Sequence, residues 1–283
     1  MADRDRRSQP GSRLTGGGVD LGAVLDLALD LAGRAGALLL DGRRHRGAGA
    51  GTKTSGTDVV TDADRASESL IVEGILAARP DDGILAEEGS ARPGTSGVRW
   101  VIDPLDGTTN YLYGLPAWVV SIGVEVDGAT QVGVVADPSH GETYSALRGA
   151  GSWCNGQRLA VSGATDLAVS LIATGFAYRP SRRMEQAAAL PLVLGATRDI
   201  RRAGAAALDL CWVASARLDG YYETGLKPWD VAAGLLIATE AGAATCGFDG
   251  GPASGASVVA ATPGIAGQLV DLLAAAGATP DPG

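Results

Sequence analysis

The stretch Trp100–Asn110, with the sequence WVIDPLDGTTN, constrains the fold of this chain more than any other segment. Its three opening residues are apolar and predict a buried strand that arrives at a turn. We expect Pro104 to end that strand, because proline fixes φ and has no N–H to donate to a neighbouring strand. The carboxylates of Asp103 and Asp106 should therefore project together from the strand end.

The residues after the two aspartates favour an anion-binding turn. Gly107 lets the backbone approach a ligand closely, and Thr108–Asn110 is a typical cap for a helical turn whose free N–H groups receive an anion. Two carboxylates beside such a turn suit a divalent cation that bridges the protein to a phosphate. The same motif alone is equally typical of a surface turn, so other segments must decide between the two interpretations.

The composition limits the class of protein. A chain of 283 residues with 46% hydrophobic and 19% charged residues is globular, and it is long enough for one large domain or two fused halves. A net charge of −9 argues against nucleic-acid binding through a diffuse basic surface. No uncharged apolar run is long enough to cross a bilayer, so we expect no membrane span.

Cysteine and histidine usage narrows the metal chemistry. Three scattered cysteines fit a reducing cytoplasm, with neither a disulfide framework nor a thiolate metal site. The two histidines, His45 and His140, are too few for an imidazole-bound zinc or iron centre. Residues 1–18 lack the apolar core of a signal peptide and are expected to form a disordered tail, and residues 278–283 a C-terminal tail.

Apolar spacing predicts alternating helices and short strands. The expected helices cover residues 19–43, 62–79, 182–194 with a break at Pro191, 204–218, 228–241 and 264–275. The expected strands cover 83–86, 100–102, 118–126, 131–136, 142–147, 170–174, 199–201, 220–223 and 257–261. No Pro/Ser-rich linker divides residues 19–277, so an N-terminal α+β half to about 160 and a C-terminal α/β half from about 161 should pack together, with a site between them.

Acidic residues recur where these elements begin or end. They are Asp64, Glu87, the Asp103/Asp106 pair and Asp230. Oxygen ligands with almost no histidine favour Mg²⁺ or Mn²⁺. Two such ions about 3.5–4 Å apart can activate a water and stabilise the leaving oxygen of an in-line displacement.

Taken in order, these motifs make the sequence resemble the inositol monophosphatase family, part of a magnesium-dependent, lithium-sensitive phosphatase superfamily. The resemblance covers about residues 20–275. It rests on Lys53…Asp58-Val59-Val60-Thr61…Asp64, Ala86-Glu87-Glu88, the run from Trp100 to Tyr111, and Trp229-Asp230-Val231-Ala232-Ala233-Gly234 leading into Glu240-Ala241-Gly242. It implies the layered α-β-α-β-α sandwich of the inositol monophosphatase and fructose-1,6-bisphosphatase superfamily, usually as a homodimer.

The resemblance also implies roles for individual residues. One Mg²⁺ is expected on Glu87, Asp103 and the carbonyl of Leu105, and a second on Asp103, Asp106 and Asp230. Thr108, hydrogen-bonded toward Asp64 and with Glu87 close by, should orient and deprotonate the attacking water. The backbone of Gly107 and Thr108 should receive the phosphate, with Lys53 near the metals. Contacts to the inositol ring are implied for Asp106, Ala206, Glu223 and Asp230.

The implied reaction is Mg²⁺-dependent hydrolysis of an inositol monophosphate to myo-inositol and phosphate, by direct attack of water and with inhibition by Li⁺. The closest alternative is the same chemistry on histidinol phosphate, fructose 1,6-bisphosphate or adenosine 3′,5′-bisphosphate, although the stretch Tyr221–Glu223 favours an inositol phosphate. A second alternative is a scaffold in the transcription machinery, which the intact acids and the negative charge disfavour. The expected partner is thus a small phosphorylated polyol, without nucleic acid or membrane.

Overall fold

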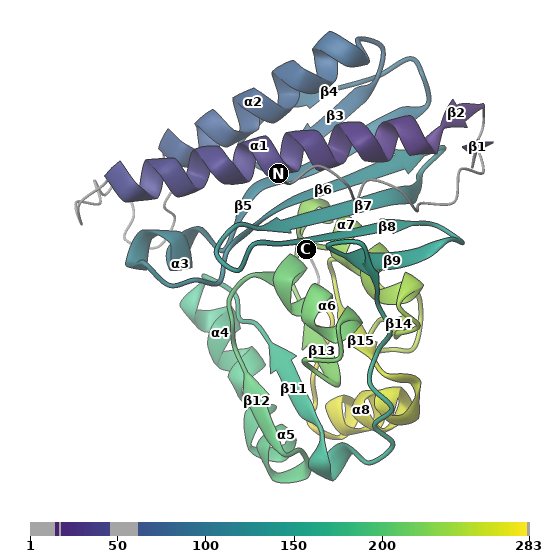
Figure 1. The fold of residues 1–283 in the computed structure, drawn as a ribbon. Coiled ribbons are helices and arrows are strands. Elements are labelled where there is room, and N and C mark those ends of the chain that lie inside the picture. Colours follow the sequence, from purple (N-terminus) through teal and green to yellow (C-terminus); the bar gives the residue numbers. More distant parts are fainter. Residues whose placement is uncertain (1–14, 17, 46–61, 282–283) are drawn as a thin grey trace, which may run out of the picture.

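The computed structural model describes residues 15–16, 18–45 and 62–281. Within these ranges the chain forms five layers that alternate between helices and sheets (Figure 1). This is the α-β-α-β-α sandwich that the resemblance implies, so the fold prediction is confirmed. Lys53 lies outside the described residues.

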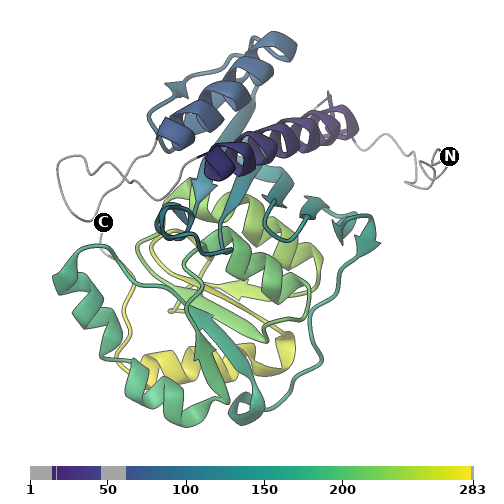
Figure 2. The same cartoon turned by 60° about the vertical axis from the view of Figure 1, so that its left-hand side comes forward.

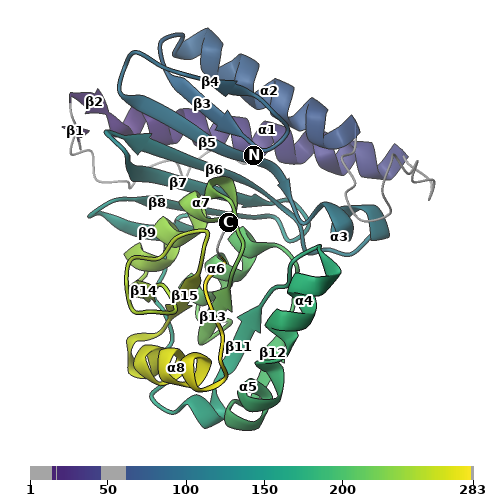
Figure 3. The same cartoon turned by 180° about the vertical axis from the view of Figure 1, so that it is seen from behind.

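The first layer is a pair of helices, α1 (Leu21–His45) and α2 (Asp62–Ala78), and it covers one face of an eight-stranded sheet (Figures 1 and 3). The strand order in this sheet is β10-β9-β8-β7-β6-β5-β3-β4. Its strands are β3 (Gly83–Ala86), β4 (Ala91–Arg92), β5 (Val98–Asp106), β6 (Val119–Val126), β7 (Ala129–Asp137), β8 (Glu142–Leu147), β9 (Gly151–Cys154) and β10 (Gln157–Arg158). The short helix α3 (Thr108–Tyr113) interrupts the path from β5 to β6.

The third layer contains α6 (Ala206–Ala214) and α7 (Pro228–Glu240), which separate the first sheet from a second sheet of five strands. The order in the second sheet is β12-β11-β13-β15-β14, with strands β11 (Leu171–Thr174), β12 (Asp199–Arg201), β13 (Gly220–Glu223), β14 (Ala244–Cys246) and β15 (Val258–Ala261). Its outer face is covered by α5 (Leu190–Ala196) and α8 (Pro263–Ala275), and α4 (Pro180–Ala187) leads into α5. Figure 2 shows the α1–α2 pair and α8 on opposite sides of the molecule.

Four clusters of buried apolar side chains fill the spaces between the layers, and alternation along the strands explains them. In β6, Val120 points into the cluster under α1 and α2, whereas Val119 points into the cluster under α6 and α7. In β15, Val258 and Val259 divide in the same way between the α6–α7 side and the α8 side. Each sheet is therefore buried on both faces, because successive side chains of a strand point in opposite directions.

The structure corrects the prediction that Pro104 ends its strand. Strand β5 continues to Asp106, but its register against β6 shifts between Asp103 and Asp106. A bulge leaves residues outside the ladder, so a proline without an N–H is tolerated there. Within the bulge, the N–H of Leu105 donates to the side chain of Asp103 at 3.0 Å.

Other boundaries also differ from the prediction. The helix expected over 204–218 is shorter, because Gly204 and Ala216 have φ of +90° and +59° and cannot be helical. Strands β4, β9, β10 and β14 were not predicted; each has only two to four residues. Part of the expected N-terminal tail, Thr15–Gly16, pairs with Val19–Asp20. In the part of the chain that the structure describes, no helix is both long and apolar enough to cross a bilayer.

Candidate active site

Strand pairing brings the first two acidic motifs together. Strands β3 and β5 are parallel neighbours, with Ala86 opposite Ile102, and the N–H of Glu87 continues the ladder by donating to the carbonyl of Ile102 at 3.2 Å. The next residue on β5 is Asp103, and the side chains of Glu87 and Asp103 are within hydrogen-bonding reach of each other. Two residues from different motifs thus become neighbours through backbone register alone.

Helix α2 is hydrogen-bonded to both segments that carry these acids. The hydroxyl of Ser67 donates to the carbonyl of Pro104 at 2.9 Å. The carboxylate of Glu68 accepts hydrogen bonds from the backbone N–H groups of Glu88 at 2.8 Å and Ser90 at 3.0 Å. The sequence analysis did not predict these contacts. The one sequence pattern that could have indicated them is that two polar residues, Ser67 and Glu68, interrupt the apolar face of a predicted helix.

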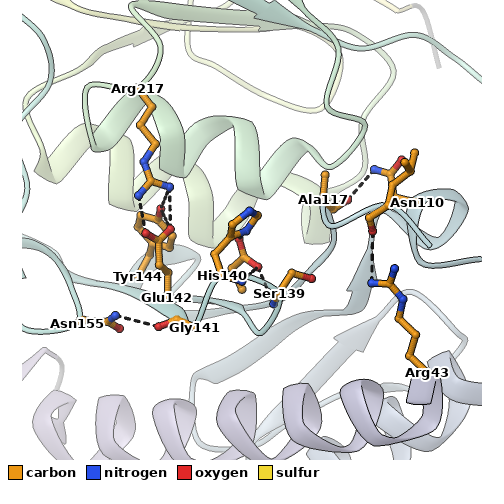
Figure 4. A network of polar contacts seen from close by, with 12 residues as sticks. Arg43, Asn110, Ala117, Ser139, His140, Gly141, Glu142, Tyr144, Asn155 and Arg217 are labelled. Atoms are coloured by element: carbon orange, nitrogen blue, oxygen red, sulfur yellow. Dashed lines mark hydrogen bonds and ion pairs between the residues drawn. The ribbon is translucent and has the colours of Figure 1, made fainter. Parts of the chain in front are cut away.

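Asp106 links the first sheet to the second half of the chain. Its carboxylate accepts a hydrogen bond of 2.7 Å from the N–H of Ala207, in the first turn of α6. The amide of Asn110 donates to the carbonyl of Ala117 at 2.6 Å (Figure 4) and to the carbonyl of Ala203 at 2.8 Å. The predicted cap is corrected here: α3 begins after Gly107, whose φ is +91°, without a side-chain cap, and Asn110 bridges two loops instead.

Asp230 enters the site from α7. It lies in the first turn of that helix, where its carboxylate accepts a hydrogen bond of 2.6 Å from the N–H of Lys227. The hydroxyl of Ser121, on β6, donates to the carbonyl of Trp229 at 3.4 Å and ties this end of α7 to the sheet beside β5. The helix therefore starts beside the strand that carries Asp103.

The acidic side chains act electrostatically on one another. Burial, followed by the charges of Glu87, Asp106 and Asp230, raises the pKa of Asp103 well above its ordinary value. Burial and the charge of Asp230 do the same to the pKa of Asp106. Loss of hydration raises the pKa of Glu87 to about 7 and that of Asp230 to about 6. Buried carboxylates that raise one another's pKa in this way are typical of functional sites.

The side chains fit Mg²⁺ in their chemistry. In the described residues, no three His, Cys, Asp or Glu side chains already stand at the spacing of a closed metal site. The candidate ligands are all hard oxygens, as Mg²⁺ prefers. A backbone N–H holds one carboxylate oxygen of Asp103, Asp106 and Asp230, which orients the second oxygen of each. A divalent cation would relieve the repulsion that raises the pKa of these groups.

The sequence pattern of the inositol monophosphatase family matches residues 20–277. This chain belongs to that family. Among curated relatives, the Nus factor SuhB of Pasteurella multocida is 44% identical over 252 residues, covering 88% of this chain and 94% of the relative. The inositol-1-monophosphatase SuhB of Mycobacterium tuberculosis is 45% identical over 232 residues, covering 78% and 80%. Among solved structures, the inositol monophosphatase of Anabaena has a TM-score of 0.81 and 37% identity, covering 91% of this chain and 97% of that one.

The resemblance to this phosphatase family is therefore confirmed. Three more residues for which the family implies a role lie close to these acids. Asp64 is buried in the first turn of α2, and its charge is one of those that raise the pKa of Glu87. Thr108 donates its hydroxyl to the carbonyl of Leu105 at 3.1 Å. The charge of Glu223 acts on Asp106, so the end of β13 faces the same acids.

Two further buried groups interact with Glu223, and one of them, Asp209, was missed in the sequence. Tyr221 is fully buried and donates its hydroxyl to Glu223 at 2.8 Å. Asp209, on α6, is also buried; burial and then the charges of Glu223 and Asp106 raise its pKa well above the ordinary value. An acidic residue in an Ala- and Leu-rich helix is the only sequence signal that could have pointed to Asp209.

Proposed function

We propose that this chain is a Mg²⁺-dependent phosphomonoesterase that hydrolyses an inositol monophosphate to myo-inositol and phosphate. One observation carries the proposal. Glu87 follows β3, Asp103 and Asp106 lie on β5, and Asp230 lies on α7, up to 143 positions apart in the sequence. Their charges nevertheless act on one another, between the first sheet and the middle helix layer. A buried acidic cluster of this kind destabilises the fold unless its charge is neutralised, so its presence points to a functional site.

We assign to the residues the roles that the family resemblance implies, and the mutual electrostatic effects of the acids support them. Glu87, Asp103, Asp106, Asp230 and the carbonyl of Leu105 would hold Mg²⁺. Bound Mg²⁺ supplies a Lewis acid that lowers the pKa of water and neutralises charge on the phosphate. Asp64 and Thr108 would orient the attacking water, and the carboxylate of Glu87 would accept its proton.

The substrate is held next to the acids. The N–H groups of Gly107 and Thr108 receive phosphate oxygens, and Lys53 adds a positive charge. Ala206 and Glu223 form the wall against the polyol ring, together with Asp106 and Asp230. Water attacks phosphorus directly, so no phosphorylated side chain forms, and the developing charge is stabilised by fixed dipoles and cations.

Phosphate release across a panel of monoesters, titrated with Mg²⁺, tests the proposal. We expect kcat/KM to be highest for an inositol monophosphate, activity to disappear with a chelator, and Li⁺ to inhibit. A higher kcat/KM for histidinol phosphate, fructose 1,6-bisphosphate or adenosine 3′,5′-bisphosphate would transfer the proposal to that substrate. Activity that persists unchanged in the chelator would refute the role of the acids.

A second candidate function comes from the relatives named Nus factors, one of which is 44% identical. A chain of this family could act in the transcription machinery as an interaction partner. Co-elution with purified RNA polymerase, retained in an Asp103→Asn variant, would support that role. If the chain does not co-elute, only the proposed hydrolase function remains. We further propose that the chain works in the cytoplasm as a homodimer, which cell fractionation and sedimentation would test.

A further inference from the structure

The carboxylate of Glu223 is held from two sides. Tyr221 and Glu223 are alternate residues of β13, so their side chains point to the same face of the sheet. That face looks toward α6, where Tyr221 packs fully buried. Its hydroxyl donates to Oε2 of Glu223 at 2.8 Å. A phenol without solvent contact keeps few alternative partners, so it fixes the direction in which the carboxylate points.

On its second side, the carboxylate occupies the space directly beside Gly175. Strands β11 and β13 are parallel with Thr174 opposite Tyr222, so Gly175 follows directly beside Glu223. A Cβ atom added at Gly175 would lie 1.9 Å from Oε2, 2.1 Å from Cδ and 2.2 Å from Oε1 of Glu223. Gly175 has an ordinary φ, so glycine is required there by space and not by backbone conformation.

We propose that Gly175 and Tyr221 are positioning residues that set substrate selectivity by holding the Glu223 carboxylate against a hydroxyl of the polyol. The inference rests on the proposed function, in which Glu223 lies against the substrate ring. Gly175 supplies the space and Tyr221 supplies the direction. Neither residue is among the proposed metal or phosphate contacts, so both should affect recognition of the leaving alcohol and leave the attack on phosphorus unchanged.

A substitution at Gly175 should move Glu223 and spare the fold. The atoms that a new Cβ would meet belong to the end of a flexible side chain, which can rotate away. Rotation breaks the hydrogen bond from Tyr221 and withdraws the acceptor from the substrate. Tyr221→Phe keeps the space and removes only the donor, so its effect should be smaller.

Steady-state kinetics with two substrates test the inference. Inositol monophosphate presents ring hydroxyls, whereas p-nitrophenyl phosphate has a leaving group without any. For Gly175→Ala we expect KM for inositol monophosphate to rise about tenfold with kcat nearly unchanged, the loss of one hydrogen bond to a charged group. Kinetics on p-nitrophenyl phosphate should stay within about twofold of the unsubstituted enzyme.

The matched control is Gly163→Ala. Gly163 is also a loop glycine with ordinary φ, and an added Cβ there would meet nothing within 4 Å. It should leave both substrates unaffected. An equal loss on both substrates in Gly175→Ala would indicate general distortion and overturn the inference.

A double-substitution cycle separates positioning from structure. In a Glu223→Ala background the space beside Gly175 is free, so adding Gly175→Ala should cause no further rise in KM and no further loss of thermal stability. Additive effects would overturn the inference even if Gly175→Ala alone folds poorly.

The outcomes also distinguish the inference from the function on which it rests. An enzyme that hydrolyses p-nitrophenyl phosphate but not inositol monophosphate disproves the proposed substrate, and the same comparison then uses the best hydroxylated monoester of the panel. An enzyme active on inositol monophosphate without a selective KM change in Gly175→Ala disproves the inference alone.

Discussion

Glu68 and Glu88 are joined by a hydrogen bond of 2.8 Å from the backbone N–H of Glu88 to the buried carboxylate of Glu68. A second bond, from the N–H of Ser90, reaches the other oxygen of the same carboxylate at 3.0 Å. The loop that carries Glu87 is therefore fixed to α2 by one side chain with two acceptors. A carboxylate that accepts backbone N–H groups makes short, charge-assisted hydrogen bonds.

Glu68→Gln should loosen this loop, because the amide has one acceptor oxygen for two N–H donors. We expect unfolding free energy to fall by about 1–3 kcal/mol. The Mg²⁺ concentration for half-maximal phosphate release should rise, since Glu87 is less well fixed. Chemical denaturation and a Mg²⁺ titration measure the two effects. Glu73→Gln, an exposed glutamate of the same helix, is the control, and equal Mg²⁺ titrations for both variants would contradict the role of Glu68.

Asp103→Asn and Asp230→Asn should each reduce turnover by orders of magnitude while unfolding stays cooperative. Each substitution removes a negative charge from a cluster whose members raise one another's pKa, so the metal-free fold loses repulsion and no core packing. Phosphate release and thermal unfolding are the two measurements. Asp271→Asn, on the exposed side of α8, serves as the control. Near-normal turnover in Asp103→Asn would refute the mechanism.

Gly107→Ala should be more harmful than Gly89→Ala. Both glycines have positive φ, +91° and +113°, so both substitutions introduce backbone strain. Only at Gly107 would the new Cβ also meet a backbone atom, the carbonyl oxygen of Ala117, at 2.7 Å. We expect a stability loss of about 1–2 kcal/mol at Gly89 and a larger one at Gly107, with activity lost. Equal losses of thermal stability in the two variants would show that the close contact with Ala117 does not add to the cost of substitution at Gly107.

Asp82 should make stability depend on pH. Burial alone would raise its pKa, but hydrogen bonds from Arg79, Ser96 and Trp100 outweigh burial and hold the pKa below the ordinary value. A depressed pKa contributes stability that is present above the unfolded-state value, about 3.9, and is lost as pH falls through the folded-state value. Asp82→Asn should lower the unfolding free energy at pH 7 by about 1–3 kcal/mol.

Measuring the unfolding free energy of Asp82→Asn and of the unsubstituted protein at low pH as well tests whether the charge of Asp82 is the cause. The difference between Asp82→Asn and the unsubstituted protein should shrink as pH falls below about 4, where the carboxylate becomes protonated. Asp81→Asn, at an exposed neighbouring position, is the matched control. A difference that stays constant from pH 7 to pH 3 would contradict the charge-based account.

A polar network away from the site shows what sequence patterns leave open. Arg217 donates two hydrogen bonds to Glu142, at 2.7 and 2.5 Å, and one to the hydroxyl of Tyr144 at 3.2 Å (Figure 4). The first residue follows α6 and the other two lie on β8, 75 and 73 positions earlier. Nothing local in the chain pairs them. The strand over 142–147 was nonetheless predicted with correct bounds, because its period is a local property.

The sequence by itself determined most of the helices and strands and the family. Apolar periods identified most helices and strands, the order of the motifs identified the family, and the choice of carboxylates over histidine indicated hard-cation chemistry. These properties depend on residues close in the chain or on residue type.

Only the tertiary structure decided how the parts meet. The parallel register of β3 and β5 places Glu87 beside Asp103, and the hydrogen bond from Ala207 brings α6 to Asp106. Position 175 requires glycine because the carboxylate of Glu223 occupies the space where a Cβ atom would lie. The bulge that carries β5 through Pro104 also depends on its neighbour β6. Each of these contacts joins residues far apart in the chain, and packing between layers selects them, so no local pattern records them.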